Sequence, residues 1–106
     1  MAGELIVYKN RTNVVPVNLG YDVSADTFAA EIREGKTKES TLIVSWTVAF
    51  LTDGTDGKLI MTLDDSALSA ITQKSGYTDL KRTSGGEPLP VFADVVKVLF
   101  RDTVTA

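Results

Sequence analysis

The segment from Asp53 to Gly57, with the sequence DGTDG, is the part of the chain best suited to metal chemistry. Clustered oxygen ligands favour Ca²⁺. A calcium-binding EF-hand loop starting at Asp53 would need an oxygen ligand at its fifth position and a glutamate at its twelfth. Those positions hold Gly57 and Asp64. We therefore predict a hairpin turn in which glycine supplies a positive φ, and no metal site.

Asp64 and Asp65 are adjacent carboxylates. Paired carboxylates can perform acid–base catalysis where burial raises the pKa of one of them. These two residues directly precede Leu68 and Ile71, whose three-residue spacing indicates a helix. Carboxylates at the start of a helix accept its unpaired N–H groups and favour the positive end of its dipole. Helix capping is therefore the preferred interpretation.

Two serine–lysine pairs, Lys38 with Ser40 and Lys74 with Ser75, could suggest a nucleophile. Such a dyad needs a buried, deprotonated lysine, and both pairs lie in polar segments. The glycine-rich run at 84–86 lacks the spacing of a phosphate-binding loop. The chain contains no cysteine and no histidine, which excludes disulfides, cysteine nucleophiles and Ser-His-Asp triads. We predict no catalytic residue, no metal and no cofactor.

Composition indicates one globular domain over residues 1–106, with 43% apolar and 24% charged residues. The net charge is −3 and the basic residues are scattered, so we do not expect a nucleic-acid partner. No stretch reaches the roughly 18 apolar residues of a membrane helix. The first residues lack the basic and apolar regions of a signal peptide.

Thirteen threonines and twelve valines favour pleated sheets, because both residues are β-branched. Alternating apolar residues and turn signals predict seven strands, at residues 4–9, 14–19, 26–34, 41–51, 58–63, 77–83 and 91–101. Pro16 cannot donate to a ladder and should lie in an edge strand. The sequence therefore predicts an all-β fold, an immunoglobulin-like antiparallel β-sandwich of about seven strands with one short helix.

The connections between these strands carry the remaining expectations. A short helix is expected at residues 65–73, ended by Gly76. Residues 84–90 should form a long, flexible hairpin loop. The apolar faces of the strands predict that four aromatic residues lie in the core: Phe28, Trp46, Phe50 and Phe100.

Several short motifs follow one another in a characteristic order. A strand ends in the Ile-Arg pair of 26–33, and an Asp-Gly turn leads into the alternating strand 57–63. A Tyr-x-Asp-Leu segment occupies 77–81, and a Val-Thr pair closes the chain at 104–105. In order and spacing these motifs resemble small bacteriophage tail- and baseplate-associated β-sandwich proteins, including the N-terminal domain of baseplate upper proteins.

This resemblance implies a virion structural protein, a tail or baseplate adaptor that links receptor-binding parts to the tail. It implies no enzymatic residues, a location in virions assembled in the host cytoplasm, and partners among other virion proteins and further copies of the chain. A capsid decoration protein is one alternative. A carbohydrate-binding module that meets cell-surface glycans, with exposed tyrosines as its platform, is another.

Contacts with partners are expected at the proline-containing edge strand, at the polar loop 35–40 and at the loop 84–90 with its surroundings. The two tyrosines are the candidates for glycan binding. The predicted partner-binding residues are Pro16, Tyr21, Lys36, Lys38, Tyr77, Pro88, Leu89 and Phe92.

Overall fold

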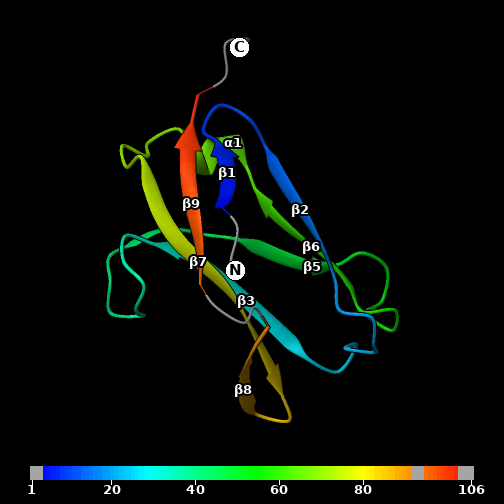
Figure 1. Cartoon of the computed structure of the whole chain (residues 1–106). Helices are drawn as coiled ribbons and strands as arrows, with labels where there is room; N and C mark the ends of the chain where they lie inside the picture. Colours follow the sequence, from blue (N-terminus) through cyan, green and yellow to red (C-terminus); the bar gives the residue numbers. More distant parts are fainter. Residues whose placement is uncertain (1–3, 92–94, 103–106) are drawn as a thin grey trace.

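A computed structural model describes residues 4–91 and 95–102. Two β-sheets enclose a shared apolar core (Figure 1). The larger sheet has the order β1-β9-β7-β3-β4, with β8 paired to β7, and the smaller sheet has the order β2-β6-β5. The strands are β1 (Glu4–Tyr8), β2 (Asn13–Asn18), β3 (Thr27–Arg33), β4 (Leu42–Ser45), β5 (Thr47–Phe50), β6 (Lys58–Leu63), β7 (Ser75–Ser84), β8 (Glu87–Pro90) and β9 (Val96–Arg101).

This topology confirms the predicted immunoglobulin-like sandwich. Strands β9, β7, β3 and β4 occupy the places of strands G, F, C and C′ of such a domain, and β2, β6 and β5 those of B, E and D. Two details differ from the prediction. The described residues form nine strands, and β1 lies beside β9 in a parallel pair, whereas the other pairs are antiparallel.

The smaller sheet follows the sequence pattern closely. Strand β2 is an edge strand, which is the position that the missing N–H of Pro16 favours. Pro16 lies opposite Ile60 of β6. Strands β5 and β6 form the predicted hairpin, closed by a hydrogen bond from the Leu51 N–H to the Lys58 carbonyl at 3.0 Å. The turn between them contains Gly54 and Gly57 at φ values of +87° and +75°.

The prediction of one strand over residues 41–51 is wrong, because the chain changes sheets at Trp46. β4 pairs with β3 in the larger sheet, and β5 pairs with β6 in the smaller one. The Trp46 N–H still bonds to the Ala30 carbonyl at 2.9 Å. Its indole Nε1–H donates to the hydroxyl of Thr78 at 3.1 Å. Trp46 therefore fixes the crossover against both β3 and β7.

The core lies between the inner faces of the two sheets. Of the residues that the structure describes, twelve hydrophobic ones are buried there, among them Ile32 and Leu80 from the larger sheet and Leu59 and Met61 from the smaller one. Trp46 and Phe100 are buried as predicted. Phe28 and Phe50 are half-buried and meet edge-to-face, with ring centroids 6.2 Å apart.

The helix prediction is correct in place but too long. α1 spans only Asp65–Leu68, and within the described residues no helix is long and apolar enough to cross a membrane. Gly76 does not end it, since this glycine is buried inside β7. A Cβ atom there would lie 2.9 Å from both the Arg33 carbonyl oxygen and Ile32 Cγ2. Close packing against β3 therefore requires the glycine.

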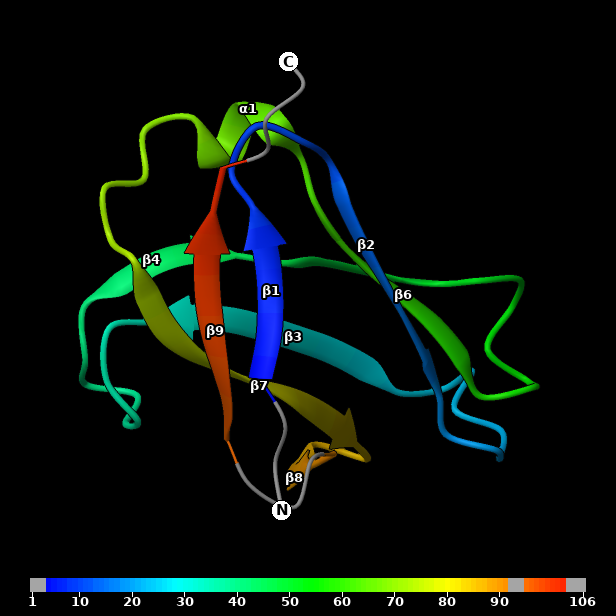
Figure 2. The ribbon, with the colours of Figure 1, turned by 45° about the horizontal axis from the view of Figure 1, so that its top comes forward.

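The segment 84–90 is not a long loop. β8 folds back on β7, with Ser84 opposite Glu87. Gly85 and Gly86 between them have φ values of +59° and +82°, as a two-residue hairpin turn requires. The hairpin extends the larger sheet beyond the first residues of β9 (Figure 2).

Candidate binding groove

The outer face of the larger sheet contains a groove of about 400 Å³. Its floor is formed by β3 and β7, one wall by the loop 35–38, and the other by Pro88, Leu89 and Val95. Alternate residues of both strands point into the core, so the remaining side chains face outward into the groove. These outward residues are Ala29, Glu31, Arg33, Tyr77, Asp79 and Lys81.

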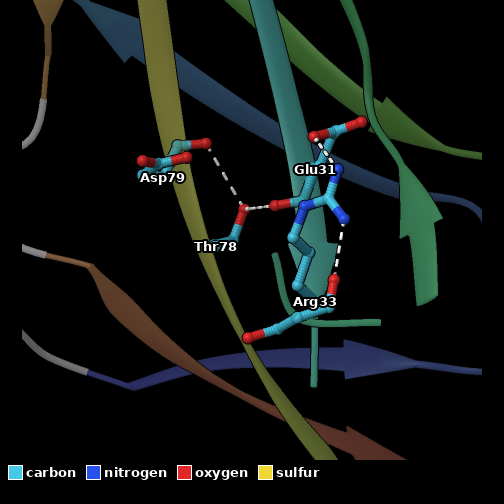
Figure 3. Close-up of polar contacts among 5 residues, drawn as sticks. Glu31, Arg33, Thr78 and Asp79 are labelled. Carbon is cyan, nitrogen blue, oxygen red and sulfur yellow. Dashed lines mark hydrogen bonds and ion pairs between the residues drawn. The ribbon is translucent and has the colours of Figure 1, made fainter. Parts of the chain in front are cut away.

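Pairing of β3 with β7 brings two carboxylates together on the groove floor. Glu31 lies directly opposite Asp79 in the antiparallel register, an unfavourable arrangement for like charges. Arg33 offsets it, since its Nη2 lies 2.8 Å from the Glu31 carboxylate (Figure 3). The floor therefore holds a compensated Glu–Arg pair next to Asp79, whose carboxylate forms no ion pair with any described residue.

Arg33 also anchors the polar loop that forms one wall. Its Nη1 donates to the Ser40 carbonyl oxygen at 2.8 Å (Figure 3). The loop is closed further by the Ser40 N–H bonding to the Thr37 carbonyl at 3.1 Å and the Glu34 N–H bonding to the Thr41 carbonyl at 2.9 Å. One guanidinium thus sets both the charge of the floor and the position of the wall.

We expect an Arg33→Met variant to loosen the wall while the strands stay intact. The methionine keeps an apolar stem but loses both hydrogen bonds. Amide exchange of Ser40 should rise by about tenfold, the effect of losing one charged hydrogen bond. A Lys36→Met variant is the control, because it changes a side chain of the same loop without touching the anchor. Equal exchange in both variants would contradict the anchoring role.

The two tyrosines proposed for glycan binding each have a cation over the ring. The Lys36 Nζ lies 5.4 Å from the Tyr77 ring centroid. The Arg82 guanidinium lies 5.3 Å from the Tyr21 ring centroid, and its Nη1 donates to the Tyr21 hydroxyl at 2.6 Å. Aromatic platforms bind sugars through open faces, so these contacts give the glycan interpretation no support.

The structure brings together five of the eight predicted partner-binding residues. Lys36, Lys38, Tyr77, Pro88 and Leu89 come from three separate segments and all line the groove.

The other three predicted residues do not line the groove. Tyr21 lies in the loop after β2, next to Arg82, whose Nε is 3.0 Å from Asp26 Oδ2. Pro16 is in the smaller sheet. Phe92 lies outside the described residues.

Among the outward residues of the groove floor, sequence reasoning predicted only Tyr77 and missed the charged residues. Arg33, Asp79 and Lys81 line it, but their motifs indicate strands and the phage resemblance, not a contact surface. The alternation of 26–34 already places Glu31 and Arg33 on the polar face of a strand. A search for charged residues on the outer faces of neighbouring strands could have found them, given the register of β3 with β7.

The other candidate chemical sites lie in the β5–β6 turn and at the start of α1. Among the described residues no group of acidic side chains could hold a metal ion. The Asp53 carboxylate instead accepts the Thr55 hydroxyl at 2.7 Å and the Thr55 N–H at 3.0 Å. Asp64 is the N-cap of α1 but makes no side-chain capping bond, so that part of the capping prediction is wrong. Asp65 accepts the Ser66 N–H at 2.9 Å.

Two loop carboxylates are stabilised in their charged form. The Ser24 N–H and hydroxyl lower the pKa of Asp22 below its ordinary value of 3.8. The Thr55 hydroxyl and N–H lower the pKa of Asp53 in the same way. Both carboxylates therefore stay ionised at pH values somewhat below their ordinary pKa, and each holds a tight local turn.

Acidification should remove the stabilisation that these two turns provide. A carboxylate whose pKa is lowered by folding stabilises the folded state above its unfolded pKa, and this contribution is lost as the pH falls through the folded value. The free energy of unfolding should therefore decrease below about pH 4. In urea titrations at several pH values, the double variant Asp22→Asn with Asp53→Asn should show a shallower decrease. If the free energy of unfolding decreased as steeply with pH as in the unmodified chain, Asp22 and Asp53 would not stabilise the turns in this way.

Comparison with protein-family models found no matching family, and a search of curated proteins found no matching relative.

Proposed function

We propose that this chain is a non-catalytic assembly protein that contacts its partners through the groove on the outer face of the larger sheet. The observation that carries the proposal is the convergence at the groove of five residues that the sequence predicts as partner contacts. They come from the loop after β3, from β7 and from β8, so only the folded chain unites them.

The composition of the groove favours a protein partner. Protein interfaces combine an apolar centre with a polar rim and are enriched in tyrosine and arginine. The groove offers Tyr77, Pro88 and Leu89 as apolar surface and Arg33 and Asp79 as directional polar groups.

The same outer face continues with apolar side chains beyond the groove. Ile6 of β1 is 40% exposed and lies opposite Leu99 of β9. Tyr8 is also exposed on this face, opposite Arg101. Exposed apolar surface next to a groove is typical of interaction sites. It extends the proposed contact surface across the sheet.

The resemblance of the sequence to phage tail and baseplate proteins supplies the context. We propose a virion structural role, as an adaptor that links receptor-binding parts to the tail. The adaptor would use the rigid sandwich as a scaffold and the groove side as its docking surface. Its partners would be other virion proteins and further copies of the chain.

The test is the location of the protein on purified particles. Mass spectrometry of particles from an infected host should detect the chain, and immunogold labelling should place it at the tail. Labelling over the capsid would replace the adaptor role by decoration. Absence of the chain from washed particles would refute a virion role.

A further inference from the structure

The groove is a basic region on an acidic protein. Four basic side chains line it, Arg33, Lys36, Lys38 and Lys81, against the two carboxylates Glu31 and Asp79. The whole chain has a net charge of −3. Lys38 and Lys81 are exposed, and neither forms an ion pair with any described residue. The groove therefore presents cations available to an external acidic group.

An acidic tip lies at the end of the sandwich away from the groove wall that the loop 35–38 forms (Figure 2). We use this name for Tyr21, Asp22, Leu51, Asp53 and Asp56, from the loop after β2 and the β5–β6 turn. The two loops form one unit, because the Val23 N–H bonds to the Gly54 carbonyl at 2.9 Å and the Leu19 N–H to the Gly57 carbonyl at 2.8 Å.

The tip combines apolar surface with fixed carboxylates. Tyr21 and Leu51 are each 51% exposed. Oδ1 of Asp22 and Oδ1 of Asp53 each accept two hydrogen bonds within their own turns. Their Oδ2 atoms have no partner among the described residues. The turns therefore orient two carboxylates in advance, which lowers the entropic cost of an ion pair with a partner.

The tip and the groove wall formed by the loop 35–38 do not meet within one molecule. The β5–β6 turn lies at one end of the sandwich and the loop 35–40 at the opposite end (Figure 2), and the longest dimension is 40 Å.

We propose that the acidic tip of one copy docks into the basic groove of the next, in a head-to-tail contact. This inference rests on the proposed assembly function and names the partner of the groove as a second copy of the chain. Unlike surface patches joined in this way form a heterologous interface, which gives a ring where the rotation closes and a filament where it does not.

The contact should be weak in solution and sensitive to salt. A groove of this size covers less than the roughly 800 Å² per partner of a stable interface, so we expect a dissociation constant on the order of 0.1 mM. Exposed ion pairs are screened beyond about 10 Å at 0.1 M salt. On a particle, high local concentration would strengthen the contact.

Charge reversal with exchange of partners tests this contact. The groove variant is Lys38→Glu with Lys81→Glu, and the tip variant is Asp22→Lys with Asp53→Lys. Sedimentation velocity at about 0.02 M salt should show concentration-dependent association of the unmodified chain. Each variant alone should associate at least about tenfold more weakly. A mixture of the two should regain association, since an acidic groove then meets a basic tip.

Two controls separate this result from general charge effects and misfolding. The variant Arg11→Glu with Lys74→Glu changes the net charge equally at exposed positions outside the groove and should associate normally. If the tip variant unfolds, Leu51→Lys with Thr52→Lys alters the same tip without removing the aspartates that hold its turns.

The inference is overturned if the unmodified chain stays monomeric at about 1 mM and low salt. It is also overturned if the groove variant associates normally, if the control loses association equally, or if the mixture regains nothing. A monomeric chain that is nevertheless found on particles would remove only the head-to-tail contact. The proposed assembly function would then stand with a different partner in the groove.

Discussion

Replacing Gly57 by alanine is expected to lower the free energy of unfolding by about 3–5 kcal/mol, because strain and steric overlap add. Gly57 has a φ of +75°, which is unfavourable for any residue with a Cβ. A Cβ there would also overlap the Tyr21 carbonyl oxygen and lie 2.8 Å from the Tyr21 backbone nitrogen. Backbone atoms cannot move aside without displacing the whole tip.

Gly20 is the matched control for this substitution. Its φ of +79° is almost the same, but a Cβ there would have no atom within 4 Å. Gly20→Ala should therefore lower the free energy of unfolding by about 1–2 kcal/mol, the cost of a positive φ alone. Urea denaturation followed by circular dichroism measures both variants. Equal losses at the two positions would show that steric overlap with Tyr21 contributes nothing.

Trp46→Ala should destabilise the protein by about 3–5 kcal/mol, as expected for a buried aromatic residue replaced by alanine. Trp46 is only 6% exposed and holds the point where the chain crosses between the sheets. The substitution leaves a cavity and removes the indole donor to Thr78. The Thr78 hydroxyl still donates to the Glu31 carbonyl at 2.8 Å.

Trp46→Phe separates packing from hydrogen bonding at this position. Phenylalanine fills much of the space but has no side-chain N–H to donate to Thr78. We therefore expect the free energy of unfolding to decrease by about 1–2 kcal/mol. Urea titrations of both variants give the comparison. A loss below about 1 kcal/mol for Trp46→Ala would mean that the crossover does not depend on this side chain.

Much of the sandwich could be predicted, because the alternation of apolar and polar residues along a strand indicates which side chains face the core. The faces of β3, β6 and β9 and the edge position of Pro16 follow from this pattern. The sheet change at Trp46 could not be predicted. Both sheets face the same core, so Val44, Trp46 and Val48 keep their alternation across the break.

Gly76 shows a second limit of prediction from local sequence. A glycine after a short helical pattern suggests a helix end, whereas here it permits the close approach of β7 to β3. The groove depends on the same long-range pairing. The register that places Arg33 opposite Tyr77 and Glu31 opposite Asp79 joins segments more than forty residues apart. Local patterns identify residues of both walls and Tyr77 of the floor as contact candidates, but not the charged residues of the floor.

The absence of cysteine from the chain allows a direct test of the groove as the assembly surface. A single Ala29→Cys variant places one thiol in the groove, and Ala49→Cys places one on the exposed face of β5. Both thiols should react rapidly with a maleimide in the free protein. In assembled particles, our account predicts that Cys at position 29 is protected while Cys at position 49 still reacts. Equal reactivity of both thiols in the particle would contradict it.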